Sequence, residues 1–434
     1  MVKHQSLQPS GIITITPSAR RLTESLRDIG YEFTTALADI VDNAVTAGAT
    51  HVDVEINFDG AESHVLVADN GSGMTAATLD ESLRFGSRRS YELGELGRFG
   101  LGLKTASISQ CRRLTVVSRH APKRRRLTVR CLDLNHIAQT DCWELTDPPI
   151  DSAYYRSLKW LNDSPGTVVV WEELDRLLPA GRPDGGWAKR RLQLLASKAS
   201  EYLGMVFHRF IEGTARREHP LVITINGEKV RPWNPFAPFE DDRAELPALT
   251  IDVDNGAVGG TVRLARFVLP TREGFSSADE FERLGGPQKW NRQQGIYIYR
   301  SDRMIQHGGW CGLRAADEHT KIARASLDFE TDLDDLFHIN VAKMRVALPP
   351  ELRPLIERPI AELCHTADAR YRRASTTRDH SPSIAPEGVK NDNLARLGGV
   401  IIAAALGTGD SDAIMRIIEA VQRTDPQAAS ALGW

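Results

Sequence analysis

The stretch Asp69-Asn70-Gly71-Ser72-Gly73-Met74 decides the fold class predicted for this chain of 434 residues. Val65, Val67 and the residues around them read like a half-buried strand, and this run ends at Asn70-Gly71. A carboxylate at a strand end, followed by glycines that let the backbone come close, suits recognition of a flat ring that bears an amino group. Ordinary hairpin turns show the same pattern, so its interpretation depends on the segments on either side.

Upstream of this stretch, the sequence predicts an amphipathic helix from Thr34 to Ala47. Its apolar side is formed by Leu37, Ile40, Val41 and Ala44. Asp39 and Asn43 are four residues apart and project from one face, whereas Asp42 points about 100° away from Asn43. In this arrangement a carboxylate can orient a water molecule while a carboxamide ligates a hard cation. A solvated helix face is the alternative.

Downstream, a glycine-rich segment leads into the start of a helix at Ala106-Ser107-Ile108. The segment consists of Gly97, Arg98, Phe99, Gly100, Leu101, Gly102, Leu103, Lys104 and Thr105. Three glycines before a helix N-terminus form an anion cradle, because backbone N–H groups point outward and the helix dipole favours phosphate. It is not a Walker loop, since Leu103 stands where that motif needs glycine. A fourth motif, Gly166-Thr167, opens an apolar strand over residues 168–171.

The order of these four motifs resembles the GHKL ATPase superfamily, which includes gyrase, MutL, heat-shock chaperones and MORC proteins. The resemblance covers about the first 170 residues and implies binding of ATP with Mg²⁺. By this resemblance Asp39 is the catalytic helix carboxylate that activates the attacking water, Asn43 is the magnesium ligand, and Asp69 takes the adenine amino group. The helix acid is usually glutamate in this superfamily. Aspartate is one methylene shorter, which puts the rate of hydrolysis in doubt more than the binding.

The same resemblance extends to the rest of the nucleotide site. The further residues implied to contact the nucleotide are Gly71, Gly73, Met74, Gly97, Arg98, Phe99, Gly100, Leu101, Gly102, Leu103, Lys104, Thr105 and Thr167. The runs 26–31 and 85–87 look most like the MORC-type and prokaryotic MORC-like branch.

The second half of the chain is similar to the transducer domain of GHKL ATPases. Residues 221–230 read as a strand, an Asn-Gly turn and a second strand, and residues 295–305 read as another hairpin. The segment 338–346 resembles the one that delivers a lysine to the γ-phosphate in MutL and its relatives, which assigns a catalytic role to Lys343. An ammonium there is a sensor of charge that is present only while ATP is bound.

These patterns predict an α+β protein in which a Bergerat-type ATPase α/β sandwich precedes a transducer-like α/β domain and a short helical tail. The ATP-binding domain with its N-terminal arm is expected over residues 1–195, and the transducer-like domain over 196–374. A linker and helical tail are expected over 375–434, with helices at 394–406 and 412–423.

Composition excludes little. The formal net charge of −3 demands neither nucleic acid nor a membrane, and the longest apolar run, residues 400–406, is too short to span a bilayer. Five scattered cysteines lack C-x-x-C spacing, so a zinc site is not expected and a reducing cytoplasm is favoured. The N-terminus lacks the pattern of a signal peptide.

One basic cluster raises the question of nucleic acid. Between residues 112 and 130 the acidic residues are absent and the basic ones are Arg112, Arg113, Arg119, Lys123, Arg124, Arg125, Arg126 and Arg130. Two interpretations are open: the tip of this hairpin binds the phosphates of a nucleic acid, or it is a solvated turn.

Three interpretations of function remain open at this stage. The first is an ATP-gated homodimeric clamp on DNA, in chromosome maintenance or antiviral defence. The second is a chaperone-like ATPase that controls a partner effector protein, and the third is an interaction module that binds nucleotide and barely hydrolyses it.

Overall fold

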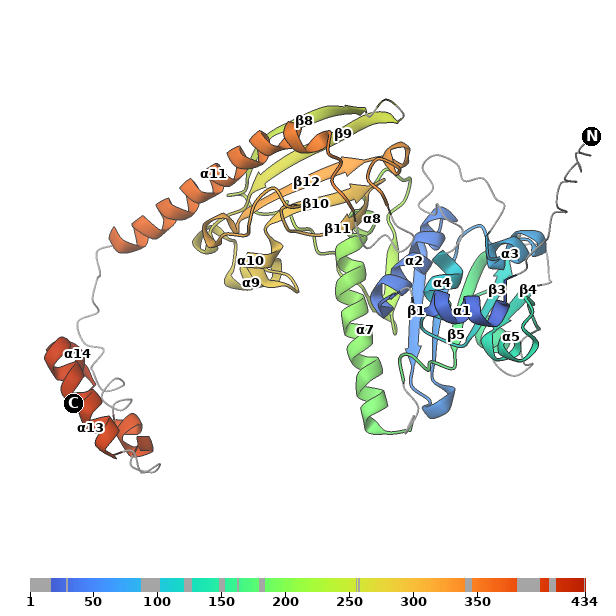
Figure 1. Cartoon of the computed structure of the whole chain (residues 1–434), viewed down its shortest axis with the longest axis horizontal. Helices are drawn as coiled ribbons and strands as arrows, with labels where there is room; N and C mark the ends of the chain where they lie inside the picture. The colour runs from blue at the N-terminus through green and yellow to red at the C-terminus, as the bar shows by residue number, and fades with distance from the viewer. Residues whose placement is uncertain are drawn as a thin grey trace, which may run out of the picture. The chain divides into compact units, whose positions relative to one another are not determined.

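The computed structural model describes residues 17–28, 30–86, 102–120, 127–147, 153–161, 164–178, 184–254, 256, 258–339, 346–380, 399–405, 411–432 and 434. The chain divides into a compact unit of residues 1–375 and a second unit of residues 376–434. The larger unit contains two mixed sheets with helices, and the smaller unit is helical (Figure 1). The predicted α+β fold class is therefore confirmed, while the boundaries predicted at residues 195 and 374 stay predictions.

The first sheet has seven strands in the order β4-β3-β5-β2-β1-β6-β7. Its pairs are antiparallel except for the parallel pair of β1 with β6. The strands are β1 (His51–Asn57), β2 (His64–Asp69), β3 (Arg113–Arg119), β4 (Thr128–Asp133), β5 (Gly166–Glu172), β6 (Val222–Ile225) and β7 (Glu228–Lys229). The hairpins predicted at β3–β4 and β6–β7 are both present.

Helices cover one face of this sheet, as α1, α2 and α4 show in Figure 1. The helices of this region are α1 (Ala19–Arg27), α2 (Phe33–Thr46), α3 (Ala76–Leu83), α4 (Gly102–Ile108), α5 (Leu134–Thr140), α6 (Ala153–Ser157), α7 (Gly186–Val206) and α8 (His208–Glu212). The predicted apolar side of α2 lies in the core, since Leu37, Ile40, Val41 and Ala44 are at most 3% exposed. Helical periodicity thus identified the buried face correctly.

The prediction that β2 is half-buried is wrong, because its first five residues are all buried. Leu66 and Ala68 point away from α2 and pack in a separate cluster with Val117, Val168 and Leu161. Both faces of the strand are covered, because Val65 and Val67 pack in the main cluster while Leu66 and Ala68 pack in the second one. The helix α4 also starts four residues earlier than predicted, at Gly102.

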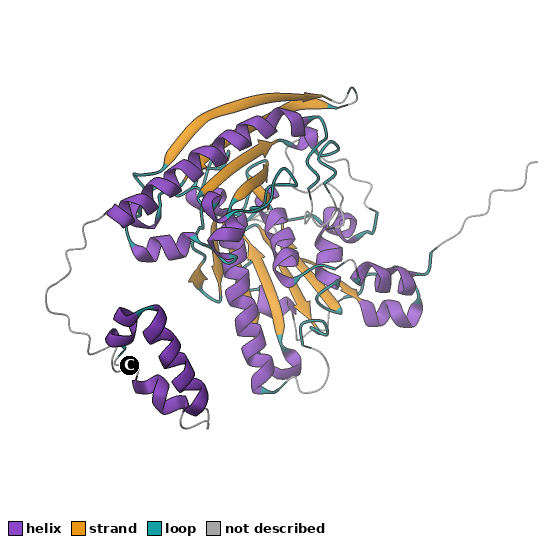
Figure 2. Ribbon diagram, turned by 60° about the vertical axis from the view of Figure 1, so that its left-hand side comes forward, coloured by secondary structure: helices purple, strands orange, loops and turns teal. Residues whose placement is uncertain are grey.

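The second sheet has five strands in the order β11-β10-β12-β9-β8, with β10 and β12 parallel and the other pairs antiparallel. Its strands are β8 (Ala244–Asp254), β9 (Gly259–Val268), β10 (Gly295–Arg300), β11 (Arg303–Gln306) and β12 (Ala323–Phe329). The associated helices are α9 (Ala278–Leu284), α10 (Lys289–Gln293) and α11 (Leu352–His380). Helix α11 lies along the β8–β9 hairpin (Figure 2).

The strand β10 contributes to two cores because its side chains alternate. Ile296 and Ile298 pack in one hydrophobic cluster with residues of α11, whereas Tyr297 and Tyr299 belong to the cluster that includes the core of the first sheet. One continuous hydrophobic core therefore joins the two sheets, and this explains why residues 1–375 form one compact unit.

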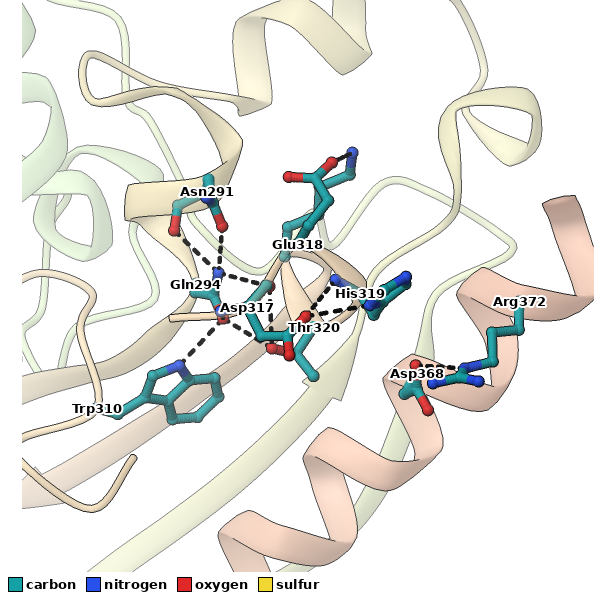
Figure 3. Close-up of polar contacts among 10 residues, drawn as sticks. Asn291, Gln294, Trp310, Asp317, Glu318, His319, Thr320, Asp368 and Arg372 are labelled. Atoms are coloured by element: carbon teal, nitrogen blue, oxygen red, sulfur yellow. Dashed lines mark hydrogen bonds and ion pairs between the residues drawn. The ribbon is translucent and has the colours of Figure 1, made fainter. Parts of the chain in front are cut away.

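A polar network fixes the segment that precedes β10. The buried side-chain amide of Gln294 donates to Asn291 and to the carbonyl oxygen of Asp317 at 2.9 Å, and its oxygen accepts from Trp310 and Thr320 (Figure 3). Both ends of the amide are satisfied, so the network stabilises the turn without leaving a group for a ligand.

The smaller unit is described by α13 (Ser411–Thr424), α14 (Pro426–Ala431) and helical residues at 399–405. Ile414, Ile418 and Ala429 form its buried contacts. Helices were predicted at both places in this tail, and Asp425 caps α14 by accepting from the N–H of Ala428.

Candidate functional site

The side chain of Asp39 lies at the point where α2, the preceding loop and α4 meet. Asp39 is 4% exposed, and its Oδ2 accepts a hydrogen bond of 2.9 Å from the hydroxyl of Tyr31. A β-carbon built on Gly102, the first residue of α4, would stand 3.5 Å from the same oxygen. The structure therefore brings the predicted helix acid together with the end of the glycine-rich segment.

Tyr31 was not recognised as a site residue from the sequence. Its hydroxyl is buried, and burial together with the charge of Asp39 raises the pKa of Tyr31 well above its usual range. The hydroxyl consequently stays protonated and acts as a donor to the carboxylate. In the sequence Tyr31 is only a tyrosine eight residues before Asp39. The tertiary structure is needed to show that its hydroxyl reaches the carboxylate.

Asn43 lies one turn further along α2 and is exposed, as a ligand for a cation bound together with a nucleotide must be. Asp42 faces elsewhere, because Arg303 of the second sheet donates to its carboxylate at 2.9 Å. Among the residues that the structure describes, no group of three or more histidine, cysteine, aspartate or glutamate side chains forms a metal cage. Mg²⁺ needs none, since it commonly binds through one or two protein ligands plus phosphates.

Asp69 closes β2 beside the first residues of β5, where it pairs in register with Thr167. Its Oδ1 accepts from the N–H of Gly71 at 2.8 Å. Burial raises the pKa of Asp69 to about 6, although hydrogen bonds from Gly71 and Thr167 oppose the rise. A carboxylate that is desolvated in this way gains when a ligand donates a hydrogen bond to it.

Two glycines let the chain pass close to its neighbours after Asp69. A β-carbon on Gly73 would approach the carbonyl oxygen of Arg119 to 1.9 Å, and Gly73 has φ +64°. A β-carbon on Gly71 would lie 2.8 Å from that of Ala47. Only glycine fits at Gly73 without rearrangement, because the chain passes close to Arg119. The approach of this backbone to a ring of a ligand stays a prediction.

The buried residue Ser118, which was not predicted from the sequence, connects two residues that were predicted to contact the nucleotide. The hydroxyl of Ser118 in β3 accepts from the N–H of Met74 at 2.7 Å and lies 3.0 Å from the hydroxyl of Thr167. Ser118 is 1% exposed. Met74 and Thr167 are 93 positions apart in the sequence. The Ser118 hydroxyl of β3 connects them, because β3 pairs with β5 and β5 pairs with β2.

Lys104 is buried in α4 rather than extended into solvent. Its Nζ donates to the carbonyl oxygen of Ser82 at 2.7 Å and lies 5.9 Å from the ring centroid of Phe85. Burial lowers the pKa of Lys104 to about 8, and the nearby carboxylate of Glu81 opposes this. Of its predicted companions, Thr105 is buried and Leu103 packs against the core.

The remaining predicted site residues lie outside the described part of the chain. These are Gly97, Arg98, Phe99, Gly100, Leu101 and Lys343.

Half of the basic cluster is already engaged within the chain. Arg112 lies 3.6 Å from Asp175, Arg113 lies 2.6 Å from Glu173, and Arg130 lies 2.5 Å from Asp80. The guanidinium of Arg119 is buried and donates to a backbone carbonyl. The other four basic residues, at positions 123–126, lie outside the described residues.

The comparisons agree with this geometry. Residues 31–167, which contain Tyr31, Asp39, Asp69 and Thr167, match the family model of histidine kinase-, DNA gyrase B- and HSP90-like ATPases. The chain therefore carries an ATPase domain of the GHKL type, as predicted.

Curated relatives place this domain near two branches. Protein MICRORCHIDIA 5 of Arabidopsis thaliana is 42% identical over 80 residues, which are 17% of this chain and 11% of that protein. The DNA mismatch repair protein MutL of Shewanella woodyi is 38% identical over 90 residues, 20% of this chain and 14% of its own length. MutL of Rhodopseudomonas palustris is 28% identical over 157 residues, 34% of this chain and 26% of its own.

The similarity to MORC and MutL proteins is thus a partial homology. The matches span between 11% and 26% of the length of these relatives. In the described parts of the chain, no helix combines the length and the apolar character that crossing a bilayer requires.

Proposed function

We propose that this protein is a slow, Mg²⁺-dependent ATPase in which Asp39 is the general base. The observation that carries the proposal is the meeting of Asp39, Tyr31 and Gly102 inside a domain of the GHKL type. The ionised carboxylate of Asp39 orients a water molecule and takes its proton, while the hydrogen bond from Tyr31 holds the carboxylate in one orientation. Asn43 ligates Mg²⁺, which neutralises charge on the phosphates when it is bound.

The adenine end of the nucleotide is bound at the edge between β2 and β5. Asp69 accepts a hydrogen bond from the adenine amino group, and its pKa of about 6 leaves it ionised at neutral pH. The backbone around Gly71 and Gly73 lies close to the ring, with Met74 and the hydroxyl of Thr167 completing the pocket. The Ser118 hydroxyl holds both residues in place through its contacts with the N–H of Met74 and the hydroxyl of Thr167.

The phosphates are bound by the glycine-rich segment 97–105 and by Lys343. Lys104 takes part by exchanging the carbonyl oxygen of Ser82 for a phosphate oxygen. Its buried ammonium is poorly solvated, which is the reason for the lowered pKa, and a phosphate is a stronger acceptor than a carbonyl group. Lys343 neutralises charge that ATP has and ADP lacks.

ATP binding drives homodimerisation in this proposal, and the dimer acts as a gated clamp on DNA in the cytoplasm. Support comes from the partial homology to MutL, which is named as a DNA mismatch repair protein, and to MICRORCHIDIA 5. The N-terminal residues 1–17 would then cross onto the other subunit.

The state of the basic cluster favours a second candidate. Because Arg112, Arg113 and Arg130 are already paired with carboxylates, the described part of this cluster offers little charge to DNA phosphates. In the second candidate the ATPase controls a partner effector protein.

One experiment separates these candidates from each other and from a module that binds without turnover. Phosphate release and oligomeric state are measured with and without duplex DNA, in ATP and in a non-hydrolysable ATP analogue. Turnover stimulated by DNA supports the clamp, and unstimulated turnover with a co-purifying protein supports the effector. Binding without phosphate release in any condition contradicts the ATPase proposal.

A further inference from the structure

A buried ion pair connects the second sheet to the helix that carries Asp39. The Nε of Arg303, the first residue of β11, donates to Oδ1 of Asp42 at 2.9 Å. Arg303 is 4% exposed and Asp42 is 1% exposed, so water does not screen the pair. The two residues are 261 positions apart in the sequence, and the contact depends entirely on how the two sheets are packed.

The surroundings of Arg303 keep its guanidinium in one place. The guanidinium lies 4.5 Å from the ring centroid of Phe207, next to the end of α7, and also donates to the carbonyl oxygen of Met304. Burial alone would lower the pKa of Arg303, but the charges of Asp42 and Asp39 and the hydrogen bond to Asp42 outweigh it, so the pKa is raised. The guanidinium therefore stays charged and interacts with both acidic residues of α2.

The turn before Arg303 is held firmly from outside the hairpin. Ser301 and Asp302 have φ of +46° and +65°, as a two-residue turn between antiparallel strands requires. Asp302 accepts from Nη1 of Arg209 at 3.1 Å and from the N–H of Arg216 at 2.9 Å. The hydroxyl of Ser301 donates to Glu330 at 2.8 Å. These contacts hold the β10–β11 hairpin in one position, and Arg303 connects it to α2.

We propose that Arg303 is a positioning residue for ATP hydrolysis, which it supports by holding α2, and with it Asp39, through Asp42. This inference rests on the proposed ATPase function. Asp39 and Asp42 are three residues apart on one helix, so a displacement of the hairpin moves both carboxylates together. Asp69 and Thr167 lie on strands that the ion pair does not contact. Asn43 lies on the same helix, so the ion pair sets the rate of hydrolysis together with the Mg²⁺-dependent part of binding, and it leaves the affinity for Mg²⁺-free ADP unchanged.

The competing explanation is an ion pair that only stabilises the fold. Removing one partner of any buried pair leaves an uncompensated charge and destabilises the protein, so loss of stability in Arg303→Met does not distinguish the two. The double variant Asp42→Asn with Arg303→Met does distinguish them. It removes both charges of the pair together, but it also lacks the attachment between hairpin and helix.

The test uses the full chain and four proteins besides the parent: Arg303→Met, Asp42→Asn, the double variant and Arg266→Met. Arg266 is the matched control, because it is 3% exposed, lies in the same sheet and pairs with Glu362 of α11 at 2.6 Å instead of with α2. For each protein the melting temperature, the affinity for ADP in the absence of Mg²⁺, kcat and KM for ATP are measured.

We expect the double variant to recover most of the melting temperature that Arg303→Met loses, while its kcat stays about 10²-fold below that of the parent, the typical effect of misplacing a reacting group by about 1 Å. ADP affinity without Mg²⁺ should stay within about twofold, since the adenine contacts of Asp69 and Thr167 are untouched. Arg266→Met should lose melting temperature and keep the parental kcat.

A double variant that hydrolyses ATP at the parental rate overturns the inference. A loss of kcat that is accompanied by an equal loss of ADP affinity, or that also occurs in Arg266→Met, overturns it too. Failure of the ATPase proposal looks different, because the parent protein itself then releases no phosphate. If Arg303→Met does not fold, the double variant and Asp42→Asn decide the outcome.

Discussion

The substitution Asp69→Asn should stabilise the protein without nucleotide while abolishing its binding of ATP. Burial raises the pKa of Asp69 from 3.8 to about 6, so the folded state holds this proton more tightly than the unfolded state. The stabilisation that comes from protonation is complete below pH 3.8 and is lost as the pH rises through 6. At neutral pH the ionised, desolvated carboxylate therefore destabilises the folded protein.

The size of this effect follows from the pKa values. One pKa unit corresponds to about 1.4 kcal/mol. Because solvent still contacts the carboxylate in part, its ionisation lowers the free energy of unfolding by about 1–3 kcal/mol. Asparagine is neutral and keeps a side-chain oxygen for the N–H of Gly71, which Asp69 accepts at 2.8 Å. It cannot supply the charged acceptor that the adenine amino group is proposed to meet.

The assay is denaturant unfolding of both proteins without nucleotide between pH 5 and pH 8, followed by titration with ADP. The gain in unfolding free energy of Asp69→Asn over the parent should grow with pH up to about pH 7 and then level off, and ADP binding should be lost. A variant that is less stable than the parent at pH 8, or a difference that does not depend on pH, refutes the reasoning about burial. Retained ADP affinity refutes the assignment of Asp69 to adenine.

Three further substitutions test separate parts of the site. Tyr31→Phe removes the hydrogen bond to Asp39 and should lower kcat about 10–100-fold with little change in KM; equal steady-state kinetics would remove Tyr31 from the site. Gly73→Ala should destabilise the protein by about 2–4 kcal/mol, because its β-carbon would meet the carbonyl oxygen of Arg119. The control Gly48→Ala shares the positive φ but has open space around the β-carbon, so denaturant unfolding should show a loss of only about 1 kcal/mol. Lys343→Ala should reduce phosphate release about 10²–10³-fold at unchanged ADP affinity and stability; equal losses of ATP and ADP affinity would make Lys343 an ordinary surface lysine.

Local patterns predicted individual helices, strands and turns well. The 3.6-residue period of α2 identified its buried side, and the Asn-Gly pair at positions 70 and 71 marked the end of β2. The Asn-Gly turn predicted the β6–β7 hairpin, where Asn226 and Gly227 both have positive φ. Each of these features depends on residues that are near one another in the sequence.

The parts that the sequence could not predict depend on distant residues. Burial of Leu66 on the second face of β2 requires Leu161, and the hydroxyl of Ser118 meets Thr167 only because β3 and β5 pair. Local patterns in one sequence do not reveal such pairs. The same is true of Asp42, whose orientation away from Asn43 followed from helical geometry, but whose partner Arg303 lies on another sheet.

The central claim is that Asp39 is the base of an ATPase, and one measurement tests it most directly. Phosphate release and ATP affinity are compared between the parent and Asp39→Asn, which keeps an oxygen for the hydroxyl of Tyr31 but cannot take a proton from water. The account predicts slow release by the parent, an Asp39→Asn protein that binds ATP with parental affinity, and a loss of at least about 10²-fold in its rate. Phosphate release by Asp39→Asn at the parental rate would contradict the account.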